Sequence, residues 1–291
     1  MLTPRGTIVG RTSRAEYDAI DAVNFSTLKH AARSPAHYLK ALTAKTSETD
    51  AMRLGTAVHA AVFEPLTYGD AVAIWDGGRR YGNPWDAFCA ENAGRLVITT
   101  EQQESALAIQ QAVQRSRFAE LVAMGESEVT VVWQHVEEQT GEVPGLTVKC
   151  KGRLDFLSAA GCIVDLKTTR DASPEAFGRS GFNLQYHVQA ALYSDGYTAA
   201  TGRQLPYVLL AVENQPPYVV QAYELSGTEL EMGRQEYRRL LRLVDGCRRS
   251  GKWPGYAESA LPFQFPHWAY GATEESESEL VFSTGSDANG F

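Results

Sequence analysis

The chain has 291 residues, of which 44% are hydrophobic, and its formal net charge is -8. This length can bury one large core, and the composition is ordinary for a globular protein. No run approaches the roughly 18 uninterrupted apolar residues of a membrane helix, and the N-terminal residues lack the apolar centre of a signal peptide. We therefore predict a cytoplasmic protein that does not enter the membrane.

Charged residues are unevenly distributed along the chain, and the spacing of the cysteines is informative as well. Five of the acidic residues and no basic ones lie between Glu274 and Asp287, so the C-terminal tail carries much of the negative charge. Basic residues gather between Arg234 and Lys252, on one predicted helix, which is either a solvated face or a stripe that faces nucleic acid. The four cysteines form no CxxC pair, so neither a zinc site nor a disulfide framework is expected.

The N-terminal third is predicted to be mostly helical. The residues before Asn24 are expected to be loop, and a short helix follows from Asn24 to Arg33. A second helix spans Pro35 to Leu42, with proline at its first position. The small, apolar run from Ala51 to Phe63 predicts a buried helix that carries His59 in its interior.

The middle of the chain changes from helical to alternating periodicity. Residues 66 to 98 show no clear period and are expected to be irregular. The Thr100-x-x-Gln103 pattern predicts a capped helix that ends near Phe118. Strands are predicted at 129–134, 146–157 and 162–168, and the short turns between them predict an antiparallel meander.

The C-terminal part is predicted to return to helix, strand and helix. A helical region runs from Ser173 to about Ala200 with a break near Gly181, and two strands follow at 206–213 and 218–225. The basic helix then covers about Thr228 to Arg249. The order of elements predicts an α/β sandwich with a mixed sheet.

Two neighbouring strands of the meander place charged side chains on matching faces. Alternate residues of a strand share a face, so Asp165 and Lys167 lie together with Ile163. On the preceding strand the charged face consists of Lys149, Lys151, Arg153 and Asp155, and Val148, Cys150, Leu154 and Phe156 take the opposite face. Two carboxylates and an ammonium are therefore expected to converge.

This convergence allows two interpretations. Asp165 lies in an apolar stretch, where an unpaired carboxylate would lose several kcal/mol of hydration, and a partly buried pair with Lys167 would compensate. A second aspartate adds a like charge, which requires a further cation or a raised pKa. Mg²⁺, for which Mn²⁺ is expected to substitute, would bind Asp155, Asp165 and the carbonyl of Leu166, while Lys167 orients the attacking water or neutralises charge on a phosphate.

The same residues carry a resemblance to a known family. Gly152-Arg-Leu-Asp155 followed after nine residues by Asp165-Leu-Lys167 resembles the PD-(D/E)XK nuclease signature. The segments GTAVHAAVFEP, VDLKTTRDASPEAF and YHVQAALYSDGY extend it to a resemblance to RecE-type exonucleases (the exodeoxyribonuclease VIII family) of the RecB-like branch, over residues 24 to 222. The resemblance implies an α/β, restriction-endonuclease-like core with a mixed central β-sheet flanked by helices, plus an N-terminal helical addition.

The resemblance also implies roles for further residues. His59 would join the metal site or contact the scissile phosphate, although a histidine satisfied within an apolar helix is the alternative. Gln189 and Tyr193 fit the QxxxY element and would act with the catalytic carboxylates; a packed helix surface is the alternative. Glu128 would be an additional metal ligand or simply a solvated strand residue.

Contacts with nucleic acid are expected outside this set. Lys29 and Arg33 are candidate phosphate contacts, with ordinary surface charge as the alternative. Arg153 on the charged strand and Tyr186, one helical turn before Gln189, are further candidates.

Three regions are expected in the chain. Residues 1–98 form the N-terminal helical region that contributes the histidine, and residues 99–270 form the nuclease core. Residues 271–291 form an acidic, disordered tail. The tail is either a docking peptide for a partner, anchored by Leu280 to Phe282, or a solubilising tail.

The activity that the resemblance implies is a Mg²⁺-dependent 5′-to-3′ exonuclease on linear double-stranded DNA. It would leave 3′ single strands for a recombinase or a single-strand annealing protein in phage or prophage recombination. A homo-oligomeric ring, tetrameric or trimeric, is expected. An endonuclease on the same core and a non-catalytic DNA- or partner-binding module are the alternatives. The cysteine pattern of iron-sulfur nucleases and the GxxxxGK[ST] loop of a fused helicase are both missing from the sequence.

Overall fold

The computed structural model describes residues 6–44, 48–141 and 144–266. The strands are β1 Gly6–Arg11, β2 Val72–Trp75, β3 Leu96–Thr99, β4 Gly125–Glu137, β5 Leu146–Ser158, β6 Cys162–Thr169, β7 Tyr207–Glu213 and β8 Val220–Glu224. The helices are α1 Arg14–Ala19, α2 Phe25–Leu28, the 3-10 helix η1 Lys29–Ala32, α3 Pro35–Thr43, α4 Asp50–Phe63, α5 Tyr68–Ala71, α6 Asn83–Glu91, α7 Thr100–Arg115, α8 Glu120–Ala123, α9 Pro174–Asn183, α10 Tyr186–Thr201 and α11 Gly227–Ser250. All these elements belong to one compact unit, which ends at Trp253.

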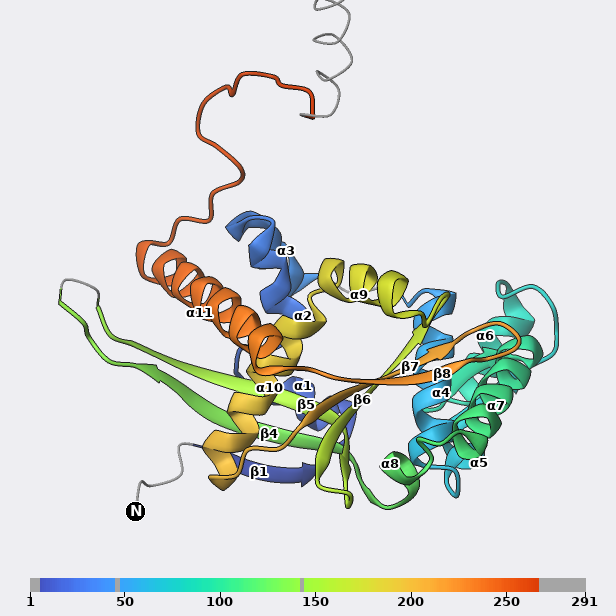
Figure 1. Ribbon diagram of the computed structural model, residues 1–291. Helices are drawn as coiled ribbons and strands as arrows, with labels where there is room; N and C mark the ends of the chain where they lie inside the picture. The colour runs from blue at the N-terminus through green and yellow to red at the C-terminus, as the bar shows by residue number, and fades with distance from the viewer. Residues whose placement is uncertain (1–5, 45–47, 142–143, 267–291) are drawn as a thin grey trace, which may run out of the picture. The chain divides into compact units, whose positions relative to one another are not determined.

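A six-stranded mixed sheet with the order β1-β4-β5-β6-β7-β8 forms the centre of this unit (Figure 1). Strands β4, β5 and β6 pair antiparallel in sequence order, which confirms the predicted meander. β7 pairs parallel to β6, and β8 pairs antiparallel to β7. The predicted α/β fold with a mixed sheet is therefore confirmed.

Helices cover both faces of the sheet, because alternate residues of its central strands enter two separate hydrophobic cores. Ile163 and Leu209 belong to a core shared with α10 and α11. Their neighbours Val164 and Leu210 belong to a second core, shared with α4 and α7. Strands buried on both faces are expected to be almost continuously apolar, and an aspartate on β6 is therefore conspicuous.

The prediction of loop before Asn24 is wrong. Residues Gly6–Arg11 form the edge strand β1, which pairs antiparallel with β4. Helix α1 then begins at a capping box in which Ser13 and Glu16 bond each other's backbone N–H groups. The Ser13-x-x-Glu16 spacing carries this signal in the sequence, but the strand is short and half exposed, so its pattern is weak.

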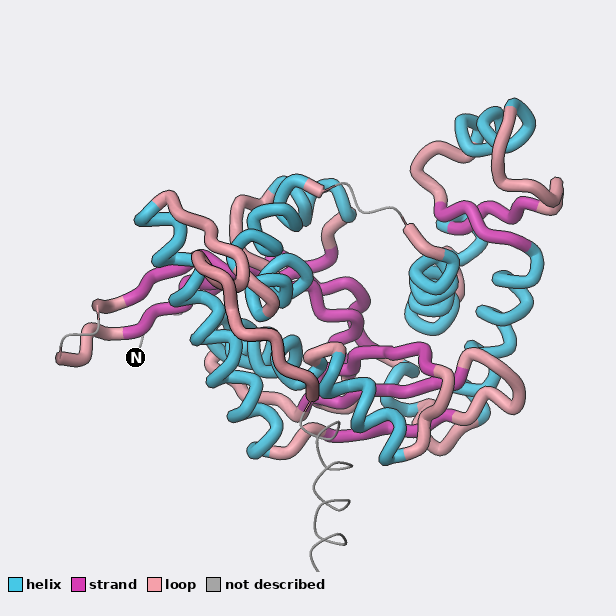
Figure 2. The backbone as a smooth tube through the Cα atoms, turned by 90° about the horizontal axis from the view of Figure 1, so that it is seen from above, coloured by secondary structure: helices cyan, strands magenta, loops and turns pink. Residues whose placement is uncertain are grey.

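The prediction of irregular structure for residues 66–98 is also wrong. β2 and β3 pair in parallel with α6 between them in the sequence, and Ala73, Trp75 and Val97 form a separate small core. Figure 2 shows these strands apart from the large sheet, at its upper right. We call residues 72–99 the small lobe. The capping box lies between Thr99 and Gln102, one residue earlier than predicted, because β3 extends to Thr99.

The other predicted elements are present with shifted ends. α7 ends at Arg115, before the predicted Phe118, and the break in the helical region lies at residues 184–185. None of the described helices combines the length and the apolar character needed to cross a membrane. The boundary at residue 98 stays a prediction. The predicted tail, residues 271–291 with the Leu280 to Phe282 anchor, lies outside the described residues.

The N-terminal segment is fixed to β5 by a buried lysine. Lys151 was expected on a charged face, but it is 3% exposed. Its ammonium donates to the carbonyls of Tyr17 (2.7 Å) and Ile20 (2.8 Å) at the end of α1. The N–H of Val23 donates to the carbonyl of Lys149 (2.9 Å), and the N–H of Lys151 donates to the carbonyl of Val23 (2.8 Å). Val23 therefore forms a single parallel bridge to β5, opposite Cys150.

Replacing this lysine should weaken the whole unit. Lys151→Met leaves the carbonyls of Tyr17 and Ile20 buried without their donor, which costs about 1–3 kcal/mol. We expect a loss of that size in the free energy of unfolding, measured by urea denaturation. Lys149→Met, at an exposed position on the same strand, should change it by less than about 0.5 kcal/mol. Equal losses in the two variants would contradict this role.

Candidate active site

Asp155 and Asp165 lie where the paired strands β5 and β6 diverge, a point of the sheet that we call the fork. β5 and β6 pair only from Phe156 and Val164 to Ser158 and Cys162. Just beyond the last pair, the N–H of Leu166 donates to Oδ2 of Asp155 (3.2 Å) rather than to a backbone carbonyl of β5. A carboxylate therefore replaces one bond of the ladder, and the fork brings Asp155 beside β6.

The two carboxylates form a buried pair of like charge. Asp165 is 1% exposed, and its Oδ2 is buried with no hydrogen-bond partner. Burial raises the pKa of Asp155 well above its usual range, and the charge of Asp165 raises it further. Burial also acts to raise the pKa of Asp165, but the charge of Lys167 and its hydrogen bond to Asp165 act to lower it, and the pKa is lowered overall. Without a cation between them, the pair therefore favours one shared proton over two full negative charges.

Lys167 supplies the positive charge on β6. Its Nζ donates to Oδ1 of Asp165 (2.8 Å) and to Oε1 of Gln189 on α10 (3.2 Å). The same Nζ lies 4.9 Å from the ring centroid of Tyr186. Burial alone would lower the pKa of Lys167, but the charges of Asp165 and Asp155 raise it overall. The group stays an ammonium at neutral pH, so it can donate hydrogen bonds but cannot act as a base.

His59 reaches the same point from α4, across the second core. Its Nε2 lies 3.0 Å from the carbonyl oxygen of Leu166, and because a carbonyl only accepts, Nε2 carries the hydrogen. Burial, and then the charge of Lys167, lowers the pKa of His59 to about 4, so the imidazole is neutral. Its Nδ1 then has a lone pair, 3.6 Å from Oδ2 of Asp155. The polar partners of His59 thus lie on β5 and β6, not within its own helix.

These groups fit a divalent cation. The unpartnered Oδ2 of Asp165, the repulsion within the pair and the lone pair of His59 all favour one. Among the residues that the structure describes, no group of three His, Cys, Asp or Glu side chains is placed to hold a metal ion. The carbonyl of Leu166 and water would have to complete the shell. This requirement suits Mg²⁺, which binds few protein oxygens and keeps several waters.

A cleft of about 1400 Å³ opens onto this site, and His59, Asp155, Gln189 and Tyr193 line its inner end. Its other walls come from the N-terminal segment, α4 and the small lobe. The lining contains the five arginines Arg11, Arg14, Arg53, Arg95 and Arg153 and the four acidic residues Glu48, Glu64, Glu128 and Asp155. The lining of the cleft is therefore close to neutral, whereas the chain as a whole carries a net negative charge.

Glu128 and Arg153 form an ion pair on the wall of this cleft. Burial raises the pKa of Glu128, while the charge of Arg153 acts against the rise. The charge of Glu128 also raises the pKa of Asp155, so the two carboxyl groups interact electrostatically. The structure thus brings Glu128 beside the site with an arginine as its partner, and its role as a metal ligand stays a prediction.

Tyr193 explains the glycine of the Gly152-Arg-Leu-Asp155 motif. Tyr193 is 8% exposed, and a Cβ atom on Gly152 would lie 2.8 Å from its ring. Only glycine therefore lets α10 approach β5 this closely, and α10 is the helix that carries Gln189 to Lys167. Tyr193 lines the cleft from this position.

The predicted phosphate contacts differ in position. Lys29 is half-buried, and burial and then the charge of Lys167 lower its pKa, so it lies on the side of the site. Arg33 is exposed at the end of η1, and neither Lys29 nor Arg33 is among the described residues that line the cleft. The contacts of both residues with DNA stay predictions.

The basic helix α11 uses most of its arginines within the chain. The ion pairs are Arg234–Asp195, Arg239–Glu236, Arg242–Glu137 and Arg249–Asp245. Arg248 donates to the hydroxyl of Tyr38 (3.2 Å). These contacts favour the solvated face over the nucleic-acid stripe that the sequence left open.

The residues that form the outer walls of the cleft were not predicted from the sequence. Arg11 and Arg14 come from the segment that was expected to be loop, and Trp85 and Arg95 come from residues expected to be irregular. The capping pattern at Ser13 could have revealed α1. The sequence holds no comparable signal for the small lobe, because its strands have only four residues each.

Comparisons with known proteins find one family and two solved structures. A family described as "PDDEXK-like domain of unknown function (DUF3799)" matches residues 24–262. The crystal structure of a protein named "Putative exonuclease" from Eubacterium rectale is similar, with 16% identity, a TM-score of 0.52 and coverage of 91% of this chain and 99% of that one. The structure of SSO0001 shares 14% identity over 74% of this chain and 84% of its own, with a TM-score of 0.27. No curated protein matches. The family match and the similarity to the Eubacterium rectale structure support the PD-(D/E)XK superfamily, and the RecE-type resemblance stays a prediction.

A divalent cation should stabilise the protein through the carboxylate pair. At a Mg²⁺ or Mn²⁺ concentration about 100 times its dissociation constant, binding adds about 2.7 kcal/mol to the free energy of unfolding, measured as a rise in Tm. Asp165→Asn removes a ligand and should abolish the rise. Glu48→Gln, a carboxylate of the cleft wall that lies outside the pair, should keep it. An undiminished rise in Asp165→Asn would exclude this cation site.

Proposed function

Because the chain belongs to the family described as a PDDEXK-like domain of unknown function (DUF3799), we propose that it is a metal-dependent deoxyribonuclease that hydrolyses phosphodiester bonds. The observation that carries the proposal is the buried carboxylate pair at the fork, with an unpartnered Oδ2 on Asp165 and a protonated lysine beside it. A purely structural ion pair of Asp165 and Lys167 would leave the second aspartate without a function.

Each residue of the site has a task in this proposal. Asp155, Asp165, the carbonyl of Leu166 and Nδ1 of His59 would hold the cation, which in such sites lowers the pKa of bound water and neutralises phosphate charge. The N–H of His59 at Nε2 fixes the ring on the carbonyl of Leu166 and so directs Nδ1.

Lys167 acts on the phosphate rather than on the cation. Gln189 and Asp165 hold its ammonium in place, and its third proton can point toward a non-bridging phosphate oxygen or the attacking water. An oriented donor of this kind stabilises charge that develops in the transition state, typically by about 3–4 kcal/mol. Gln189 is thus a positioning residue.

We further propose the 5′-to-3′ polarity on linear duplex DNA, with 3′ single strands as product for a recombinase or an annealing protein. The RecE-type motifs support the polarity. The similarity to a protein named an exonuclease supports end-dependent cutting. A homo-oligomeric ring, tetrameric or trimeric, rests on the same resemblance and would be measured by analytical ultracentrifugation.

The proposed reaction predicts how labelled duplex DNA is degraded. With Mg²⁺, linear duplex labelled separately at its 5′ and 3′ ends should lose the 5′ label first, and covalently closed circles should stay intact. EDTA should stop both losses. Cutting of closed circles would establish an endonuclease instead, and no Mg²⁺-dependent cutting of any DNA would remove the nuclease proposal.

Two substitutions should separate catalysis from folding. We expect Asp165→Asn and Lys167→Met each to lower kcat by at least about 100-fold. Asp171→Asn, at an exposed position just beyond β6, should keep the wild-type rate. The measurement is initial digestion rate at saturating DNA, with circular dichroism as the control for folding. Wild-type rates in Asp165→Asn would contradict the mechanism.

Lys29 should contribute to DNA binding without taking part in the hydrolysis reaction. Lys29→Gln removes one phosphate contact, so affinity should fall for every sequence, and the slope of log K against log salt should decrease by about 1. Lys40→Gln, an exposed lysine on α3, should leave the slope unchanged. Binding is measured by fluorescence anisotropy in EDTA over a range of salt concentrations. Equal slopes in Lys29→Gln and wild type would place Lys29 outside the DNA path.

A further inference from the structure

The face of α4 that lines the cleft forms an open groove. Besides Arg53, the lining residues of this helix are Met52, Gly55, Thr56, His59, Ala60 and Phe63. Their spacing of three, four and seven residues marks one helical face, and the residues in its middle are small. A Cβ atom added to Gly55 would meet nothing nearer than the hydroxyl of Thr168, at 4.0 Å. With a rise of 1.5 Å per residue, the groove extends about 10 Å from His59 to Met52.

A supported indole ring lines the same cleft on the side of the small lobe. Trp85 on α6 is half-buried and packs edge to face on Trp75, with ring centroids 5.5 Å apart. Trp75 in turn packs against Phe88 (5.1 Å), and its Nε1–H donates to the carbonyl of Gly78 (3.3 Å). Trp85 is therefore held from behind while it contributes to the cleft wall.

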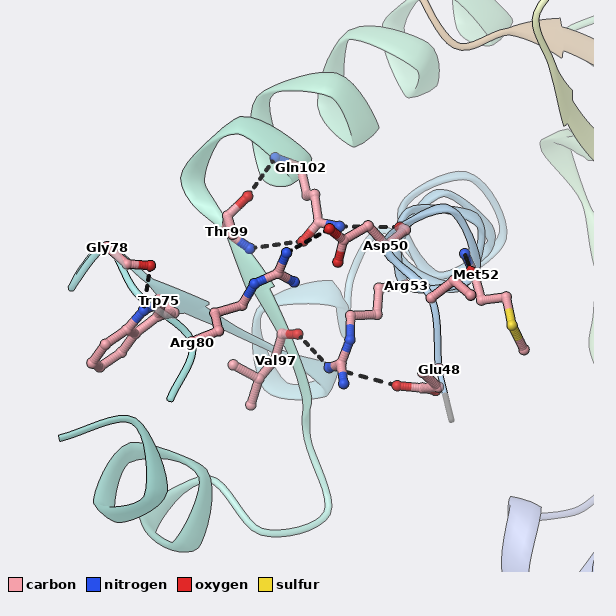
Figure 3. Close-up of polar contacts among 11 residues, drawn as sticks. Glu48, Asp50, Met52, Arg53, Trp75, Gly78, Arg80, Val97, Thr99 and Gln102 are labelled. Atoms are coloured by element: carbon pink, nitrogen blue, oxygen red, sulfur yellow. Dashed lines mark hydrogen bonds and ion pairs between the residues drawn. The ribbon is translucent and has the colours of Figure 1, made fainter. Parts of the chain in front are cut away.

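The small lobe is fastened to the N-terminal end of α4 (Figure 3). Arg53 donates to the carbonyl of Val97 (3.1 Å). Arg80 pairs with the carboxylate of Asp50 (2.6 Å), and the side chain of Gln102 donates to the backbone carbonyl of Asp50 (3.1 Å). Because α4 carries the imidazole of the site, these bonds fix the position of the lobe relative to the reacting groups.

From this arrangement we propose that Trp85 is a stacking subsite for an unpaired base of the DNA strand that enters the cleft. The inference rests on the proposed function, and it specifies the form of DNA that the site receives. Aromatic rings bind single strands by stacking on successive bases, with little dependence on sequence. The arginines that line the cleft are bonded within the chain, for example Arg11 to Glu64 and Arg153 to Glu128, so the indole ring carries the proposal.

The subsite distinguishes unpaired from paired DNA. A base inside a duplex has both faces covered by its neighbours, so it can stack on Trp85 only after it leaves the helix. The strand therefore separates from its complement before the scissile phosphate reaches Asp155 and Asp165.

Binding to forked DNA with and without bases tests this subsite. The full chain is titrated in EDTA, which prevents cleavage, with a duplex that ends in a short unpaired fork and with the same duplex carrying abasic sites in the fork. We expect the wild type to bind the fork with bases about 5- to 100-fold more tightly, because alanine substitution of one stacking ring costs about 1–3 kcal/mol. Trp85→Ala should lose this preference.

Further variants separate the subsite from folding. Trp85→Leu keeps an apolar contact with Trp75 but has no aromatic face, so it should lose the preference as well. Trp85→Phe should retain most of it. Tyr81→Ala is the matched control, because Tyr81 is a 67% exposed aromatic residue of the same lobe that does not line the described cleft. It should bind both forks like the wild type.

The outcomes are distinct from those of the proposed function. A wild type that ignores the bases, or a Trp85→Leu variant that still prefers them, overturns the subsite even if Mg²⁺-dependent cutting is intact. Loss of the preference in Tyr81→Ala would move base binding to the outer surface of the lobe and overturn it too. If the preference for the fork with bases depends on Trp85 but no DNA is cut with Mg²⁺, the subsite is supported and the nuclease proposal fails.

Discussion

Two carboxylates buried in one fork of a β-sheet repel each other, and a single lysine cannot neutralise both of them. Asp155 and Asp165 resolve this without an ion by holding one proton between them, which the raised pKa of Asp155 expresses. Charge that is confined in this way is the basis for the proposed affinity for a divalent cation. The surrounding fold keeps the two groups together: β6 leaves β5 at this point, and the backbone of Val23 occupies the edge of β5 that β6 abandons.

The sheet and the helices contribute different chemistry to the site. The strands supply the charged groups, Asp155, Asp165 and Lys167, on a rigid frame that is covered on both faces. The helices supply neutral groups: α4 brings His59 to the carbonyl of Leu166, and α10 brings an amide oxygen to the lysine. Because burial keeps the imidazole neutral while the carboxylates keep the lysine charged, each group has the protonation state that its proposed role requires.

Sequence periodicity predicted the inner site well and its outer walls poorly. Alternation along β5 and β6 was enough to place Asp165 with Lys167, because both strands are long and buried. The same alternation put Lys151 on a charged face, whereas its ammonium is buried against α1, a contact made across 134 residues of chain. The small lobe escaped prediction because two four-residue strands and a short helix leave no periodic signal. The roles of His59 and Gln189 were predicted from a family resemblance, since residue spacing alone cannot show which helices reach the sheet.

The most direct test of this account is the position of a bound ion. We expect a crystal grown with Mn²⁺ to show an anomalous peak between the carboxyl groups of Asp155 and Asp165, within about 2.3 Å of the oxygen of Asp165 that lacks a partner here. Crystals of Asp165→Asn under the same conditions should lack it. An ordered site in which both carboxylates of the wild type stay metal-free at saturating Mn²⁺ would contradict the central claim.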